Sequence, residues 1–110
     1  MAIGFIFNNP GQTQEQYDAS VEQLNLEESL PEGWIFHAAG PTEDGWRVME
    51  VWESQEAADA YFQESLGQVL QNVGVSLSQP DTFTVYNVIA RRAFGNALSR
   101  TIPRPGTTGA

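Results

Sequence analysis

The sequence contains no cysteine and only one histidine, His37. Disulfide bonds, thiolate catalysis and cysteine-ligated zinc or iron–sulfur centres are therefore excluded. No apolar run approaches the roughly 18 to 20 residues that a membrane-spanning helix needs. The first residues lack a basic leader and turn polar at Asn8, which is too early for a secretory signal. We therefore expect a cytoplasmic protein without a membrane segment, whose 110 residues hold one domain.

Basic residues are scarce and unevenly distributed. Residues 1 to 90 hold one arginine and all 14 acidic residues, a net charge of −13, whereas residues 91 to 110 hold four arginines and no acid, a net charge of +4. An acidic body repels phosphate backbones, so we expect no nucleic-acid partner, and ligands with several negative charges are disfavoured. The alternative is that the acidic side chains have no role in selecting ligands and only keep the surface solvated.

Apolar periodicity predicts four strands and two helices. Residues 2 to 8 alternate as a strand, and a capping box of Thr13 and Gln16 begins a helix of about three turns. Ser54 offers an N-cap to a longer helix, in which apolar residues recur every three or four positions up to Gly74. A last strand follows over residues 82 to 89.

A hairpin over residues 34 to 53 joins the two central strands and contains all three tryptophans. Its Asp44-Gly45 dipeptide is typical of a two-residue turn with positive φ at both positions, which would place His37 opposite Trp52. A three-residue turn with a glycine bulge would instead place His37 opposite Val51.

The order of strand, helix, strand, strand, helix, strand predicts an α+β, ferredoxin-like βαββαβ domain over residues 1 to 90 with a four-stranded antiparallel sheet. Two helices cover one face of such a sheet, yet apolar side chains occupy both faces of these strands. Exposure of large apolar side chains forgoes roughly 1.5 to 3 kcal/mol each. We therefore expect a homodimer joined through the uncovered faces, and the alternative is a monomer with a partly apolar sheet surface.

Three segments of the hairpin resemble the dimeric α+β barrel superfamily: His37-Ala38-Ala39-Gly40-Pro41, Gly45-Trp46-Arg47-Val48 and Val51-Trp52-Glu53-Ser54. The chain is most similar to the small bacterial members related to antibiotic biosynthesis monooxygenases, over about residues 2 to 89. The resemblance implies a dimeric α+β barrel with a pocket between sheet and helices in each subunit. The superfamily includes cofactor-independent oxygenases of polycyclic aromatics, haem-degrading enzymes, cyclases and stress proteins, so the resemblance leaves the reaction open.

His37 and Glu50 are the candidate catalytic residues. A neutral imidazole on a strand beside aromatic side chains can accept a proton from a phenol, and Glu50 can orient it. The alternative is a structural histidine whose hydrogen bonds are satisfied by the backbone or by Glu50. A metal site of His37, Glu50 and Glu53 is less favoured because only one imidazole is present. No cofactor is expected, although His37 could ligate haem.

A pocket for a small apolar or aromatic molecule would draw on the aromatic side chains, which also suit a core. The candidate substrate-binding residues are Trp34, Phe36, Trp46, Trp52, Tyr61, Phe62 and Asn87. Arg47 could bind an acidic group of a ligand, but pairing with the neighbouring carboxylates of Glu43 or Asp44 is the favoured interpretation.

We expect residues 91 to 110 to form a basic tail, flexible at its proline-rich end, that is an arm within the dimer, a disordered extension or a docking segment for a partner protein. Two functions follow from the sequence as a whole. The first is a cofactor-independent oxygenase or cyclase-like enzyme that deprotonates an aromatic or polyketide-like substrate. The second is a non-catalytic, small-molecule-binding or accessory homodimer.

Overall fold

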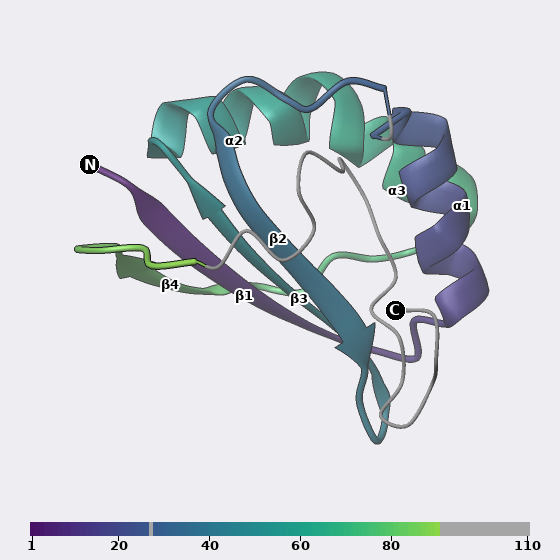
Figure 1. Cartoon of the computed structure of the whole chain (residues 1–110). Helices are drawn as coiled ribbons and strands as arrows, with labels where there is room; N and C mark the ends of the chain where they lie inside the picture. The colour runs from purple at the N-terminus through teal and green to yellow at the C-terminus, as the bar shows by residue number, and fades with distance from the viewer. Residues whose placement is uncertain (27, 91–110) are drawn as a thin grey trace, which may run out of the picture.

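The computed structural model describes residues 1–26 and 28–90. A sheet forms one layer and helices form the other (Figure 1), in the order β1 (Ile3–Pro10), α1 (Gln14–Leu24), β2 (Trp34–Pro41), β3 (Gly45–Trp52), α2 (Gln55–Tyr61), η1 (Phe62–Leu66), α3 (Gly67–Val73) and β4 (Asp81–Thr84). The four strands are antiparallel in the order β2-β3-β1-β4. The predicted ferredoxin-like α+β fold is confirmed. None of the helices in the described ranges is long and apolar enough to cross a membrane. The predicted tail lies outside these residues.

Side-chain caps begin both helical segments where the sequence predicts them. Thr13 accepts a hydrogen bond from the backbone N–H of Gln16, and the Gln16 side chain accepts one from the backbone N–H of Thr13. The Ser54 hydroxyl accepts from the backbone N–H of Ala57. These bonds satisfy backbone donors that have no partner within the helix. The long second helix ends at Gly74, whose left-handed φ of 79° suits glycine.

A π-helical turn, η1, interrupts the second helix between α2 and α3. The apolar side chains Ala58, Phe62, Leu66 and Leu70 follow one another at steps of four residues. In a regular α-helix each such step overshoots a full turn by about 40°, so three steps would rotate Leu70 by about 120° away from Ala58. One extra residue held in a π turn removes about 100° of this rotation. The π turn therefore keeps Ala58 and Leu70 on the buried face, where both lie.

The hairpin pairs in neither of the predicted registers. His37 faces Glu50, not Trp52 or Val51, because the chain turns at Glu43–Asp44 rather than at Asp44–Gly45. The backbone N–H of Thr42 donates to the carbonyl of Gly45 over 2.9 Å, and neither turn residue has a positive φ.

Contacts with β1 explain this turn. The Asp44 carbonyl accepts a hydrogen bond from the backbone N–H of Gly11 over 2.8 Å, and a Cβ atom on Gly45 would collide with the carbonyl of Asn9. Gly45 is therefore needed for close packing of β3 on β1, and not for the conformation of the turn. Tertiary packing overrides the local preference of the Asp-Gly dipeptide.

The last strand is shorter than predicted. β4 ends at Thr84, whereas the alternating pattern predicts a strand as far as Ile89. β1 pairs with β4 only over Ile3–Ile6, and one further backbone bond joins the N–H of Val85 to the carbonyl of Ala2. Beyond Val85 the chain has passed the end of the β1 ladder. Alternation alone does not reveal where a neighbouring strand stops.

The core lies between the sheet and the helices. Phe5 and Phe7 of β1 project to the helical side, where both rings pack edge-on against Phe62 at centroid distances of 5.8 and 6.0 Å. Trp52 of β3 is fully buried beside them. Because side chains alternate along a strand, Gly4 and Ile6 project to the opposite face of the sheet, together with Met49 of β3 that pairs with Ile6. Figure 1 shows no labelled helix on that opposite face.

Candidate functional site

A small cavity of about 50 Å³ lies between the sheet and the helices. Its walls are mostly apolar and come from strands β1, β2 and β3, from the helical elements α1, α2, η1 and α3, and from the segments that precede α1, β2 and β4. The polar side chains in the walls are contributed by Asn9, Gln12, Tyr17, Ser20, His37, Glu50 and Tyr61. An apolar cavity with few polar groups is typical of small-molecule sites.

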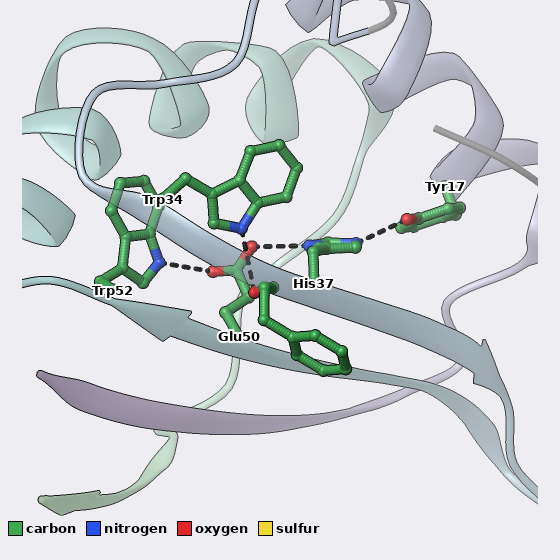
Figure 2. A network of polar contacts seen from close by, with 6 residues as sticks. Tyr17, Trp34, His37, Glu50 and Trp52 are labelled. Atoms are coloured by element: carbon green, nitrogen blue, oxygen red, sulfur yellow. Dashed lines mark hydrogen bonds and ion pairs between the residues drawn. The ribbon is translucent and has the colours of Figure 1, made fainter. Parts of the chain in front are cut away.

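His37 and Glu50 form the polar centre of this cavity. They face each other on β2 and β3, and the distance between His37 Nδ1 and Glu50 Oε2 is 2.8 Å. The second carboxylate oxygen of Glu50 accepts a hydrogen bond from the Trp52 indole over 3.2 Å. Figure 2 shows this carboxylate held between the two rings. Glu50 is only 6% exposed, so these two bonds satisfy a carboxylate that the core would otherwise disfavour.

Tyr17 completes a chain of three side chains. It comes from α1, and its hydroxyl lies 2.6 Å from His37 Nε2 (Figure 2). Burial, followed by the negative charges of Glu50 and Asp18, raises the pKa of Tyr17 to about 12. The phenol therefore remains protonated at neutral pH.

The hydrogen bonds define the tautomer of His37. A carboxylate only accepts hydrogen bonds, so Nδ1 carries the proton that His37 donates to Glu50. In the neutral imidazole Nε2 is then the acceptor, and it accepts from the Tyr17 hydroxyl. The arrangement presents a basic nitrogen toward α1 and places a carboxylate behind it, where it stabilises an imidazolium ion.

Two aromatic side chains flank the centre. The Trp34 ring stands nearly perpendicular to the His37 ring at a centroid distance of 5.2 Å. Tyr61 of α2 packs on Trp52 at 5.4 Å, and burial together with the charge of Glu50 raises its pKa above the usual range. Tyr61 thus remains a neutral hydrogen-bond donor at the cavity wall.

The structure brings some of the predicted site residues together and not others. His37, Glu50, Trp34 and Tyr61 line the cavity. The others lie around it or elsewhere: Trp52 and Phe62 pack in the core, Trp46 is buried beside Tyr17, Phe36 is 40% exposed on a strand position opposite Val51, and Asn87 is exposed beyond β4. The indole N–H of Trp46 is buried and has no hydrogen-bond partner among the described residues.

Tyr17 is a side chain of the candidate site that the sequence did not reveal. In the sequence it belongs to the apolar stripe of the first helix, with Val21 and Leu24. Its contact with His37 spans 20 residues and depends on how α1 lies on the sheet. The buried polar pair Asn9 and Gln12, joined by a 2.9 Å hydrogen bond, was also missed, although these residues are only three positions apart.

The site offers little to a metal or to haem. Among the described residues, no group of three histidine, aspartate or glutamate side chains is placed to hold a metal ion. Haem ligation would require His37 Nε2, which is bonded to Tyr17, in a cavity of about 50 Å³ that is far smaller than a porphyrin. The residues present therefore do not fit haem.

No family model and no curated protein matches the sequence. Solved structures do match, and they show that the chain has the ferredoxin-like α+β fold of antibiotic biosynthesis monooxygenase-like proteins, as the sequence resemblance predicted.

Three of these structures illustrate the similarity. A proposed antibiotic biosynthesis monooxygenase from Chloroflexus aurantiacus J-10-fl is 18% identical, covers 82% of this chain and 98% of its own, and has a TM-score of 0.60. SnoaB, a cofactor-independent oxygenase from Streptomyces nogalater, is 14% identical with the same coverages and a TM-score of 0.56. A proposed antibiotic biosynthesis monooxygenase from Deinococcus radiodurans is 13% identical, covers 83% and 98%, and has a TM-score of 0.53. At these identities the similarity concerns the fold alone.

Proposed function

We propose that this protein is a cofactor-independent oxygenase or cyclase-like enzyme that removes a proton from a small aromatic or polyketide-like substrate. The observation that carries the proposal is the hydrogen-bonded chain Tyr17–His37–Glu50 in the wall of an apolar cavity. The description of SnoaB, which shares the fold, as a cofactor-independent oxygenase supports it.

His37 is the proposed base. When a phenol or enol replaces the Tyr17 hydroxyl at Nε2, the imidazole accepts the substrate proton and Glu50 stabilises the resulting imidazolium. Tyr17, whose pKa is raised to about 12, is then free to donate a hydrogen bond to the oxyanion that forms. Trp34 provides an aromatic surface beside the imidazole.

In the oxygenase form of the reaction, dioxygen is the oxidant. The deprotonated substrate carbon of a CH₂ group bonds to one oxygen atom, and the peroxide accepts a proton. Loss of water then leaves a carbonyl at that carbon, so that one oxygen atom enters the product and the other leaves as water. The residues of the site supply proton transfer and a substrate cavity, and the substrate itself supplies the electrons.

A non-catalytic binding protein is the second candidate. Both ring nitrogens of His37 already have partners, and the cavity of about 50 Å³ is smaller than any aromatic substrate. These features suit a structural histidine in a homodimeric binding or accessory protein.

Oxygen uptake with 1,8-dihydroxyanthrone distinguishes the two functions. For the enzyme we expect uptake above the spontaneous rate, and a loss of about 100-fold or more in the His37→Ala variant if it folds normally. Gln63→Ala on the exposed side of η1 serves as the control. Equal uptake by both proteins and by buffer, with a lower melting temperature for His37→Ala, would contradict catalysis and support the binding protein.

We also propose that two copies pair through the face of the sheet opposite the helices. Large apolar side chains on this face remain accessible, with Phe36 at 40%, Met49 at 38% and Phe83 at 49% exposure. These residues lie on three different strands, so the apolar surface extends across the sheet. Such a contiguous patch is typical of an interface.

A further inference from the structure

Two hollows in the structure share part of their walls. Besides the inner cavity that contains His37, an outer groove of about 490 Å³ runs along η1, α3 and the segment that follows α3. Leu66, Leu70 and Leu77 line both hollows. These three side chains therefore form the partition between the groove and the cavity.

The inner cavity is too small for an aromatic ligand unless it is joined to the groove. A cavity of about 50 Å³ holds only a few water molecules, since each needs roughly 10 to 15 Å³ of such space. Pockets for small molecules usually measure about 300 to 1,000 Å³. The inner cavity joined to the groove falls in this range, and the inner cavity alone does not.

Leu77 is the part of the partition best placed to move. It is 39% exposed, whereas Leu70 is 9% exposed in the middle of α3. Leu77 lies between β4 and α3 in a segment without helix or strand, and this segment is fixed on both sides. The N–H of Val75 donates to the Leu70 carbonyl over 2.9 Å, and Ser78 donates to Asn9 Oδ1 through its N–H over 3.1 Å and its hydroxyl over 2.8 Å. Because these bonds hold the backbone on both sides, a movement at this place would be one of the Leu77 side chain.

The chemistry of the groove limits what enters. Most of its wall is apolar, and no charged side chain takes part: the lining residues are Phe62, Leu66, Gly67, Leu70, Gln71, Gly74, Val75, Ser76 and Leu77. Two of these are glycines, which leave room beside the helix backbone. The net charge of −13 on residues 1 to 90 further disfavours anionic ligands. The groove fits an uncharged aliphatic group.

We propose that the outer groove is the mouth of the cavity, that Leu77 is its gate, and that the ligand is a neutral phenol or enol with an aliphatic substituent. The hydroxyl group binds at His37 and the substituent lies between Leu66 and Leu70 and extends into the groove. The position of the hydroxyl group rests on the proposed function, whereas the gate and the aliphatic subsite rest on the shared leucine partition.

A series of 4-alkylphenols from 4-methylphenol to 4-hexylphenol tests the proposal with the intact protein. Calorimetry should show affinity that increases by about fourfold for each added methylene group. In stopped-flow tryptophan fluorescence, Leu77→Ala should accelerate the association of 4-hexylphenol at least fivefold, and Leu77→Trp should slow it. Leu30→Ala removes a similarly exposed leucine that lines neither hollow, and it should leave the rate unchanged.

The outcomes separate this inference from the proposed function. Affinity that does not depend on chain length, or Leu77 variants that bind at the wild-type rate, would overturn the gate and the aliphatic subsite. If 4-methylphenol then still lost tenfold or more in affinity in His37→Ala, the proposed function would stand alone. Chain-length dependence and altered rates in the Leu77 variants, with no loss of affinity in His37→Ala, would support the gate and contradict His37 as the group that binds the hydroxyl.

Discussion

Glu50 is the residue around which the polar contacts of the site are arranged. Its two oxygens accept hydrogen bonds from His37 and Trp52, and its charge contributes to the raised pKa of both Tyr17 and Tyr61. A buried charge acts strongly on its neighbours because little water screens it. One carboxylate thus directs the lone pair of His37 away from itself and adds to burial, the larger cause, in raising the pKa of the two phenols. A site that abstracts protons and hydrogen-bonds an oxyanion needs both effects.

The raised pKa of Tyr17 predicts how stability depends on pH. The pKa is about 12 in the folded protein and 10.0 ordinarily, so the folded state resists ionisation of this phenol. The stabilisation is fully present below pH 10 and is lost as the pH rises toward 12. A two-unit shift corresponds to at most about 2.7 kcal/mol, and we expect about 1 to 2 kcal/mol because Tyr17 is only partly buried.

Urea unfolding between pH 8 and pH 11.5 measures this loss. In Tyr17→Phe the free energy of unfolding should decline less steeply above pH 10 than in the wild type. Between pH 8 and pH 9 the two slopes should agree, because Tyr17 stays protonated there in both the folded and the unfolded protein. Tyr61 adds a decline of the same sign in both proteins, because its pKa is raised too. Parallel curves across the whole range would show that Tyr17 is not the group responsible.

Among the secondary-structure elements, β3 begins at a glycine that the packing requires. An added Cβ atom on Gly45 would meet the carbonyl of Asn9 and lie 2.8 Å from the backbone N of Gly11. Gly45→Ala should therefore destabilise the protein by about 1 to 3 kcal/mol, since backbone atoms must move. Gly40→Ala is the matched control on β2, because a Cβ atom there meets nothing within 4 Å.

Thermal or urea unfolding of the two alanine variants gives the comparison. Gly40→Ala should stay within about 0.5 kcal/mol of the wild type. A similar small effect of Gly45→Ala would mean that the Asp-Gly dipeptide contributes only to the turn and that β3 does not depend on this close approach.

The same elements show how far sequence patterns reach. The caps of Thr13 and Ser54 and the order of the elements were predicted correctly, because they depend on residues close together in the chain. The hairpin register was wrong, because contacts of Gly11 and Asn9 with the turn decide it.

The site shows the same division. The proximity of His37 and Glu50 was predicted, since both lie on one hairpin, although neither predicted register pairs them directly as the structure does. The contribution of Tyr17 was not predictable, since helix periodicity gives the buried face of α1 and not its position along the sheet. The π turn was not predicted either, since apolar residues spaced by four positions also occur in regular amphipathic helices.

On the scale of the whole molecule, the two faces of the sheet differ in what covers them. The helices cover the face that carries Phe5, Phe7 and Trp52, which are at most 3% exposed. On the other face, Ile6 and Met49 pair on the two central strands, and Phe83 covers Gly4. The acidic residues give the molecule a net charge of −9 that favours solubility, yet this face exposes the large apolar side chains of Phe36, Met49 and Phe83.

The proposed pairing of two copies through this face predicts a mass and a variant that changes it. Light scattering at micromolar concentration should give about 24 kDa, twice the 12.1 kDa of one chain. Met49→Asp should give 12.1 kDa, because burying an unpaired carboxylate in the interface costs several kcal/mol. Gln63→Asp adds the same charge to the exposed side of η1 and should leave the larger mass unchanged. A wild-type mass of 12.1 kDa would show that a single copy tolerates this apolar face in water, and the proposed dimer would then be wrong.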